Sequence, residues 1–354
     1  MPQDGDLLAS IDRLRDARVL CIGDVMLDHY VYGEVARLSP EAPVPVLAID
    51  SESHNLGGAG NVLRNLAALG AGISFVSVVG NDDAGREVQN LLAALDGAEI
   101  HVLVQPQRVT TVKTRFIHVN QHLLRADRES AAPLGPYIRD DLLRLVRELV
   151  TSHNVVAVSD YAKGVLTEGV AFEIIKTAQE AGARVVVEPK GGDHIRYRGA
   201  DVLTPSRREL AQATGLPVGT SAEVVAAAQA LIERCGFGAV LVLLGRDGMI
   251  LAEPGGSVPI ALASGDSHDS GGTEDTALAA LAAGVGAGLP LAMAARIAGI
   301  AVGIARSKTG TAVASASELA AVLAGGARSE LREHGLGIEM AAQPHRGGQG
   351  EAQR

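Results

Sequence analysis

Apolar runs alternate with amphipathic stretches along most of the chain, and this alternation predicts the fold. Stretches with helical spacing occur at 138–151, 170–181, 206–214 and 221–235, and short apolar runs occur between and after them at 155–164, 183–191, 200–205 and 239–249. An amphipathic stretch over 1–17 and apolar runs at 19–24 and 73–85 precede them. Strands and helices at this spacing form right-handed βαβ units. We therefore predict an α/β fold with a doubly wound, mostly parallel sheet and helices on both faces.

Two other segments have a pattern typical of strands with one exposed face. Residues 29–53 and 101–125 alternate apolar and polar side chains around short turns. We predict that they pair into a small antiparallel sheet outside the main layer, which serves as a lid, a dimer surface or both. An exposed apolar face needs a partner, which favours a homodimer.

The same pattern predicts the limits of the folded part and its location. We predict a folded domain over 10–325 and a flexible tail over 326–354, where the sequence becomes polar and rich in glycine. The first ten residues lack the basic start and apolar core of a signal peptide. The uncharged run 277–295 is interrupted by Gly284, Gly288 and Pro290, so we expect two buried helices rather than a membrane span, in a cytoplasmic protein.

Composition and charge narrow the class of partner. Hydrophobic residues make up 47% of the chain and aromatic residues 3%, so the core must be mainly aliphatic, as in parallel sheets covered by helices. The net charge of −10 argues against a nucleic-acid partner, although local lysines and arginines can still bind small anions. Cys21 and Cys235 have no metal-binding spacing and are expected to be buried thiols in a reducing compartment.

The strongest candidate for chemistry is a glycine-rich turn that opens into a helix within residues 264–281. Gly272 gives the turn conformational freedom, and residues 273–275 form the expected first helical turn. A helix N-terminus favours an anion such as a transferring phosphoryl group. Asp275 could then take a proton from a substrate hydroxyl. The same residues also fit an ordinary helix N-terminus, in which Asp275 only complements the helix dipole.

Polar side chains follow several of the predicted strands or begin the next helix. The carboxyl ends of parallel strands meet at one edge of the sheet, so these side chains should lie close together. Carboxylates and amides bind polyol hydroxyls, and lysines bind phosphate. The set predicts a sugar phosphate as ligand and phosphoryl transfer as reaction, and its members are Asp24, Asp28, Asn61, Asp160, Lys163, Glu188, Lys190 and Asp275. The glycines before Asn61 do not follow a G-x-G-x-x-G pattern, so we do not expect a dinucleotide site.

Several longer motifs resemble the ribokinase-like (PfkB) sugar kinases. They are V-L-C-I-G-D-V-M-L-D-H-Y-V-Y-G, R-L-S-P-E-A-P-V-P-V-L, G-G-A-G-N-V, V-N-Q-H-L-L-R-A-D, V-S-D-Y-A-K-G and P-K-G. Within this family the chain is similar to the D-glycero-β-D-manno-heptose 7-phosphate kinase domain of bifunctional heptose kinase/adenylyltransferases. The resemblance covers roughly residues 10–325, and S-P-E-A-P-V-P-V with S-D-Y-A-K-G is its most specific part.

The resemblance implies phosphorylation of the anomeric hydroxyl of heptose 7-phosphate, with ATP and Mg²⁺, on the route to ADP-heptose and the lipopolysaccharide core. It implies Asp275 as the base and an anion hole at Gly272, Thr273 and Glu274. The sugar-phosphate side would comprise Asp28, Gly57, Gly58, Asn61, Lys113, Arg125, Asp127, Asp160, Lys163 and Lys190. The nucleotide side would comprise Ser206, Glu209, Leu243, Gly245, Gly248 and Gly299, with Glu209 also near the metal. A separate adenylyltransferase is an expected partner.

The sequence departs from the family pattern mainly on the nucleotide side. Glu274 stands where the pattern D-x-T-G-A-G-D-T has glycine, and it adds a negative charge near the path of the γ-phosphate. Two like charges about 4 Å apart repel by about 4 kcal/mol at a surface-like dielectric. The pattern also differs at four further positions, where it has aspartate, asparagine, threonine and asparagine, and this chain has Glu188, Ser206, Leu243 and Gly299 in that order. Two alternatives therefore stay open: a weak or inactive homologue that only binds a sugar phosphate, and a PfkB kinase for fructose phosphate, a nucleoside or another sugar.

Overall fold

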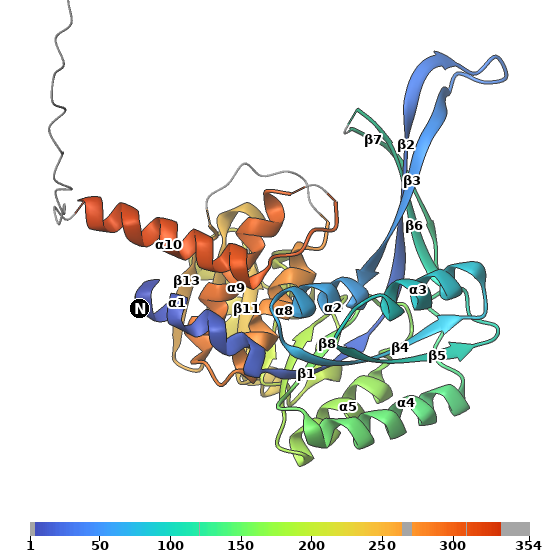
Figure 1. The fold of residues 1–354 in the computed structure, drawn as a ribbon. Helices are drawn as coiled ribbons and strands as arrows, with labels where there is room; N and C mark the ends of the chain where they lie inside the picture. Colours follow the sequence, from blue (N-terminus) through green and yellow to red (C-terminus); the bar gives the residue numbers. More distant parts are fainter. Residues whose placement is uncertain (1–3, 120, 264–270, 309, 334–354) are drawn as a thin grey trace, which may run out of the picture.

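The computed structural model describes residues 4–119, 121–263, 271–308 and 310–333. Its main layer is a nine-stranded sheet with the order β13-β12-β11-β10-β9-β8-β1-β4-β5, shown in Figure 1. The strands are β1 (Arg18–Gly23), β4 (Gly72–Gly80), β5 (Ala98–Gln105), β8 (Val155–Ser159), β9 (Arg184–Glu188), β10 (Val202–Leu203), β11 (Ala239–Leu243), β12 (Met249–Glu253) and β13 (Gly256–Ile260). All neighbours from β5 to β11 pair in parallel, and only β12 and β13 are antiparallel.

Helices cover both faces of this sheet, so the predicted doubly wound α/β fold is confirmed. One face carries α1 (Asp4–Ile11), α2 (Ala59–Ala68), α3 (Asp83–Ala93), α8 (Thr273–Gly286), α9 (Leu291–Arg306) and α10 (Ala316–Glu333). The other carries α4 (Pro136–Leu149), α5 (Glu168–Glu180), α6 (Arg207–Thr214) and α7 (Ser221–Cys235). Short 3₁₀ helices connect them at η1 (Asp12–Asp16), η2 (Val150–Ser152), η3 (Ile195–Tyr197) and η4 (Gly245–Asp247).

Most strands of the sheet contribute side chains to two separate cores, one on each face. In β1, Val19 and Cys21 pack under α2 and α8, whereas Leu20 and Ile22 pack on the side of α4 and α5. Burial on both faces explains why the strands read as continuous apolar runs rather than as alternating ones. Cys21 and the second cysteine, Cys235, are both buried free thiols, as the sequence predicted.

The alanine-rich region forms two packed helices, as expected for 277–295. Helix α8 packs against α9 and contacts β1, β8 and β9. A side chain at Gly284 would place its Cβ 2.6 Å from that of Ala294, so the close approach of the two helices requires glycine there. None of the helices in the described residues is long and apolar enough to cross a membrane.

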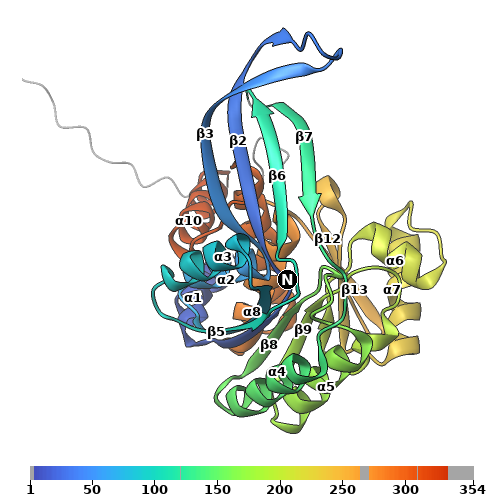
Figure 2. The ribbon, with the colours of Figure 1, turned by 90° about the vertical axis from the view of Figure 1, so that its right-hand side faces the viewer.

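A second, four-stranded sheet projects from the body and forms the lid, as Figures 1 and 2 show. Its order is β3-β2-β6-β7, and its strands are β2 (Val25–Leu38), β3 (Pro45–Gly58), β6 (Thr111–His118) and β7 (Gln121–Arg128). The outer pairs are antiparallel, as predicted for this small sheet, but the central strands β2 and β6 pair in parallel, which the sequence did not predict. Between β3 and β6 the chain forms β4 and β5 of the main sheet. It then returns to the lid, so β6 can run in the same direction as β2.

Two predicted boundaries also differ from the structure. Residues 101–105 belong to β5 at the edge of the main sheet and not to the lid. A half-buried edge strand alternates in the same way as a lid strand, so the pattern alone did not separate them. Helix α10 continues to Glu333, past the expected start of the tail at 326. The rest of that tail, 334–354, and the turn at 264–270 lie outside the described residues.

Candidate active site

The site is organised by the start of helix α8. Gly272 is the N-cap residue and has a φ of +85°, which favours glycine. A side chain there would also place its Cβ 2.3 Å from Nδ2 of Asn61 on α2. Glycine therefore allows the α8 N-terminus to lie directly against α2, and it brings Asn61 next to Asp275.

Asp275 is buried and held by two donors from different elements. Asn61 Nδ2 donates to Oδ2 at 2.9 Å, and the Tyr161 hydroxyl donates to Oδ1 at 2.6 Å. Burial raises the pKa of Asp275 to about 7, and the charges of Glu274 and Asp28 also raise it, while the two hydrogen bonds oppose the shift. A carboxylate with a pKa near neutrality is suited to accept a proton.

One pocket lies between this carboxylate and the lid. It has a volume of about 290 Å³. Its basic side chains come from the lid, from the loop after β8 and from the loop after β9, and its acidic ones include Asp28 and Asp275. A basic, half-open pocket suits an anionic small molecule. The lining residues are Met26, Asp28, Gly58, Lys113, Arg115, Arg125, Tyr161, Lys163, Lys190, Gly272, Glu274, Asp275 and Thr311.

Three cations that line this pocket pair with acidic side chains beside it. Lys113 Nζ lies 3.3 Å from Asp127 Oδ2, and Arg125 Nε lies 2.9 Å from Oδ1 of the same carboxylate. Lys163 Nζ lies 2.8 Å from Glu129 Oε2. Asp127 is not among the pocket's lining residues, so the structure gives it the role of orienting two cations rather than lining the site.

Arg115 is a site residue that sequence reasoning missed. Its Nη1 lies 2.6 Å from Oδ1 of Asp28, and both side chains line the pocket. Arg115 follows Lys113 by two positions on β6, and side chains two apart lie on the same face of a strand. That spacing was the available signal. Tyr161, in the quoted S-D-Y-A-K-G motif, was missed in the same way.

The two sugar-side glycines differ in their placement. Gly58 lines the pocket, has a φ of +57° and begins helix α2. Gly57 is absent from the lining, but a Cβ on it would lie 2.5 Å from Oδ2 of Asp28. Gly57 therefore leaves room for the Asp28 carboxylate at the pocket's edge.

Asp24 and Asp160 lie beside the pocket rather than in its lining. The Asp24 carboxylate accepts hydrogen bonds from the backbone N–H groups of Tyr161, Lys163 and Val165. Asp160 accepts from Tyr197 and Arg196 side chains, both at 2.7 Å, and from the backbone N–H of residue 162. In this structure the two carboxylates fix the loop that presents Tyr161 and Lys163.

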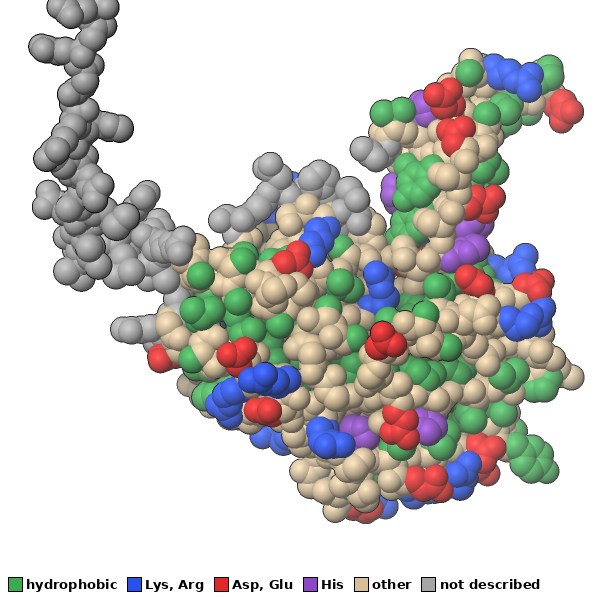
Figure 3. All heavy atoms as spheres, viewed as in Figure 1, with side chains coloured by type: hydrophobic (Ala, Val, Ile, Leu, Met, Phe, Trp, Pro, Cys, Tyr) green, Lys and Arg blue, Asp and Glu red, His purple; other side chains and the backbone are tan. Residues whose placement is uncertain are grey.

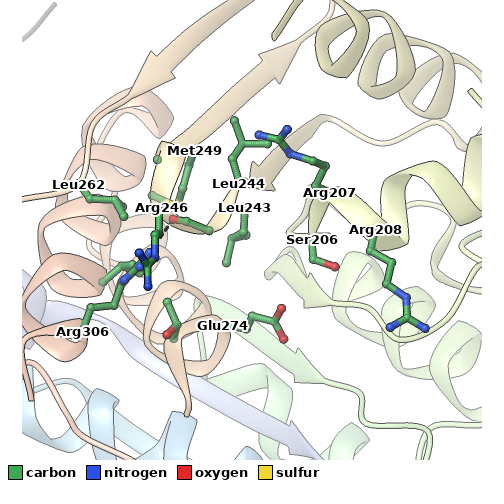
Figure 4. Close-up of a pocket in the computed structure, with 14 residues that line it drawn as sticks. Ser206, Arg207, Arg208, Leu243, Leu244, Arg246, Met249, Leu262, Glu274 and Arg306 are labelled. Carbon is green, nitrogen blue, oxygen red and sulfur yellow. Dashed lines mark hydrogen bonds between the residues drawn. The ribbon is translucent and has the colours of Figure 1, made fainter. Parts of the chain in front are cut away.

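A second pocket, of about 420 Å³, also reaches the α8 N-terminus, where it is lined by Thr273 and Glu274. Figure 4 shows side chains that line it. It contains six of the predicted nucleotide-side or anion-hole positions, including Glu274. Its lining residues are Ser206, Arg207, Arg208, Leu243, Leu244, Gly245, Arg246, Gly248, Met249, Leu262, Thr273, Glu274, Val302 and Arg306.

Gly299 is not among these lining residues, contrary to the prediction. A Cβ on Gly299 would lie 2.7 Å from the carbonyl oxygen of Ala261 and 2.9 Å from Cγ2 of Ile260. Glycine at this position lets α9 approach the end of β13. The same helix reaches the pocket further along, through Val302 and Arg306.

Glu274 lines both pockets and so lies between them. Burial raises its pKa, the charge of Lys190 opposes the shift and the charge of Glu209 adds to it. Glu188, at the end of β9, is also buried, and burial together with Asp275 and Glu274 raises its pKa. Carboxylates are therefore concentrated around the start of α8.

Glu209 is held in a capping box at the start of α6. Its Oε2 accepts hydrogen bonds from the backbone N–H of Ser206 at 3.0 Å and from the Ser206 hydroxyl at 2.7 Å. Its Oε1 lies 3.0 Å from Nζ of Lys190. Ser206, which stands where the family pattern has asparagine, therefore caps α6. Through Glu209 and Lys190, it also connects α6 to the pocket under the lid.

Comparisons with known proteins identify the family. The pfkB family carbohydrate kinase profile matches residues 16–318. The bifunctional protein HldE of Paramagnetospirillum magneticum is 49% identical over 318 residues, which cover 90% of this chain and 65% of that protein. HldE of Rhodospirillum rubrum is 46% identical over 323 residues, covering 91% and 64%. The chain thus spans about two thirds of the length of these relatives.

Solved structures share the fold. Arabidopsis thaliana ribokinase, complexed with ribose and ATP, has a TM-score of 0.67 and 21% identity, covering 87% of this chain and 98% of that one. The tetrameric inhibited form of Escherichia coli phosphofructokinase-2 has a TM-score of 0.73 and 18% identity, with the same coverage. These likenesses confirm the ribokinase-like architecture. The profile match over residues 16–318 and the identity to the HldE proteins lead to one conclusion: the chain belongs to the pfkB family of carbohydrate kinases, enzymes that transfer a phosphoryl group to a sugar.

Proposed function

We propose that this chain transfers the γ-phosphoryl group of ATP to the anomeric hydroxyl of D-glycero-β-D-manno-heptose 7-phosphate, giving the 1,7-bisphosphate. One observation carries the proposal: the buried Asp275 lies at the start of α8, where a basic pocket under the lid meets a second pocket on the nucleotide side. The choice of sugar is supported by the HldE relatives and by the heptose kinase motifs.

Each part of the site has a role in this reaction. Asp275 takes the proton of the attacking hydroxyl, and the backbone N–H groups at the α8 N-terminus stabilise charge on the transferring phosphoryl group. Asp28 and Asn61 bind sugar hydroxyls. Four cations of the pocket under the lid bind the 7-phosphate. They are Lys113, Arg125, Lys163 and Lys190.

Mg²⁺ is expected with ATP, and the oxygen donors beside the α8 N-terminus suit it. Glu209 carries a carboxylate 3.0 Å from Nζ of Lys190, and it would help to hold the ion. No group of three acidic, histidine or cysteine side chains in the described ranges forms a metal site by itself. Mg²⁺ keeps waters and phosphates as ligands and needs few protein groups. When bound, it neutralises phosphate charge.

The direct test is ADP release by the purified chain with Mg·ATP and a panel of acceptors. The panel comprises heptose 7-phosphate, fructose 6-phosphate, ribose and adenosine. The proposal requires turnover that depends on heptose 7-phosphate and exceeds that with the other acceptors. Turnover with only another acceptor would show that the substrate assignment is wrong and that the chain is nevertheless a kinase.

Glu274 supports a second candidate, a homologue that binds sugar phosphate with little or no catalysis. Its carboxylate lies between the two pockets and opposes an incoming polyphosphate. Such a protein would be thermally stabilised by heptose 7-phosphate and unaffected by Mg·ATP. Stabilisation by both ligands supports the kinase.

We also propose that two copies of the chain associate through their lids, and that an adenylyltransferase uses the product. Apolar side chains are exposed on the lid, among them Leu38, Ile49 and Leu124 with relative exposures of 63%, 55% and 60%, and Figure 3 shows hydrophobic side chains on this projection. Light scattering should find a dimer that Leu124→Asp weakens. The adenylyltransferase follows from the heptose kinase resemblance.

A further inference from the structure

The second pocket, called the nucleotide-side pocket from here on, is lined by more positive than negative side chains, which is unusual for this acidic chain. Among the described residues, four arginines line it and Glu274 is the single carboxylate, although the whole chain has a net charge of −10. Figure 4 shows Arg246 and Arg306 on one side of the pocket and Arg208 on the other, with Leu243 between them. The pocket is therefore locally basic and suits a ligand with several negative charges.

The four arginines differ in how they are held. Arg207 Nη2 lies 2.8 Å from Oδ2 of Asp247, and Arg306 Nη1 donates to the carbonyl oxygen of Gly245 at 2.7 Å. Within the described ranges, the side chains of Arg208 and Arg246 make no hydrogen bond or ion pair. Two guanidinium groups thus face the pocket with their donors available.

The position of Arg208 is unfavourable for the helix that carries it. Arg208 lies in the first turn of α6, directly after Ser206 and Arg207. The positive end of the helix dipole disfavours cations there, so local stability does not explain the choice of arginine. A bound anion would reverse the effect, because the helix N-terminus and the guanidinium would then attract the same group.

The pocket also lacks the polar groups that the family pattern places there. Ser206 is used in the capping box with Glu209, and Leu243 has no hydroxyl. Building on the proposed kinase function, we propose that Arg208 and Arg246 bind the phosphates of the nucleotide donor and replace those groups. Guanidinium groups form paired hydrogen bonds to phosphate oxygens and keep their charge at any relevant pH. They also offset the charge of Glu274, so the pocket keeps its capacity to bind a nucleotide, with other residues in contact with the phosphates.

The test measures binding and needs no turnover. The full chain and the variants Arg208→Ala and Arg246→Ala are titrated calorimetrically with Mg·ATP, AMP and tripolyphosphate. Arg144→Ala is the matched control, because Arg144 lies on α4 and pairs with Asp141 and Glu148. Heptose 7-phosphate binding and melting temperature verify that each variant is folded. Arg208→Lys serves as a second variant that keeps the charge and loses the paired geometry.

We expect each alanine variant to bind Mg·ATP and tripolyphosphate about tenfold more weakly, since hydrogen bonds to charged groups are the stronger class. AMP binding should change by less than about twofold, because the effect depends on the number of phosphates. Arg208→Lys should fall between the wild type and Arg208→Ala. Unchanged Mg·ATP affinity in both alanine variants would overturn the inference, as would an equal loss for AMP and ATP.

The result also separates this inference from the proposed kinase reaction. Sugar-dependent ADP release by the wild type, with unchanged ATP affinity in both variants, rejects the arginine assignment and keeps the kinase. Arginine-dependent binding of tripolyphosphate, without any sugar phosphorylation by the wild type, keeps the arginine assignment and rejects the kinase.

Discussion

The hydroxyl of Tyr161 donates a hydrogen bond of 2.6 Å to Oδ1 of Asp275, and the two residues are 114 positions apart in the chain. Asp275 begins α8, whereas Tyr161 lies in the loop after β8, which Asp24 holds through backbone N–H groups. Asn61 donates to the other oxygen of the same carboxylate. The orientation of the proposed base is therefore set by three separate parts of the fold.

Replacing Tyr161 by phenylalanine should shift the pH dependence of catalysis. The lost hydrogen bond stabilises the ionised carboxylate, so the pKa of Asp275 should rise further above its value of about 7. We expect kcat/KM at pH 7 to fall by about two- to fivefold and to recover at pH 9, as for a shift of up to about one unit. Tyr137→Phe is the control, since Tyr137 is 87% exposed. A pH profile identical to that of the wild type would show that Tyr161 does not tune the base.

Asp275→Asn should change the pH dependence of stability. Burial raises the folded-state pKa of Asp275 to about 7, above its ordinary 3.8. The folded state therefore binds this proton more tightly than the unfolded chain, and the resulting stability is complete below about pH 4 and lost as the pH rises through about 7. Asparagine has no such proton.

Urea unfolding at pH 5 and pH 8 measures this effect. The free energy of unfolding of Asp275→Asn relative to wild type should increase with pH, by up to about 1.4 kcal/mol per pH unit. Asp140→Asn is the exposed control, because Asp140 pairs only with its neighbour Arg139 in the described structure. Equal differences at the two pH values would argue that Asp275 is ionised at both.

Removing the charge of Glu274 should improve the use of ATP. Glu274 lies between the two pockets, and its carboxylate opposes the donor phosphates. We expect Glu274→Gln and Glu274→Gly to lower the KM for Mg·ATP or to raise kcat, by about fivefold, well under the full like-charge estimate. Glutamine is the cleaner variant, because glycine costs about 1 kcal/mol in a helix. No gain in either variant would mean that this carboxylate does not meet the phosphates.

Lys163→Ala should weaken the acceptor and leave the donor unaffected. Lys163 lines the pocket under the lid and pairs with the half-exposed Glu129. We expect the KM for heptose 7-phosphate to rise by about tenfold, as for a lost charge-assisted contact to phosphate. Steady-state kinetics with both substrates measure it, and Lys176→Ala on α5 is the control. An equal rise in both KM values would place Lys163 outside the phosphate subsite.

The fold could be predicted well from periodicity, because burial on two faces leaves continuous apolar strands between amphipathic helices. The sequence predicted less well which strands pair with one another. The pattern of β5 is that of any half-buried strand, and its place beside β4 depends on the path of the chain. Likewise, the parallel pairing of β2 with β6 is a property of topology rather than of local sequence.

For the site, residue type predicted location better than role. Asp275, Asn61 and Lys190 meet as expected at the strand ends. Asp160 carries the same chemistry, but its hydrogen bonds go to Tyr197 and Arg196, which a sequence does not reveal. Such roles depend on which neighbours satisfy a carboxylate, and only the folded chain decides this.

The most direct measurement is ³¹P NMR of the wild type and Asp275→Asn mixed with Mg·ATP and heptose 7-phosphate. The wild type should convert ATP to ADP while a second, anomeric phosphate signal appears on the sugar in equal amount. Asp275→Asn should form this signal at least about a hundredfold more slowly, the range expected for loss of a general base, while it still binds heptose 7-phosphate. Comparable product formation by both proteins would contradict the assignment of Asp275 as the base.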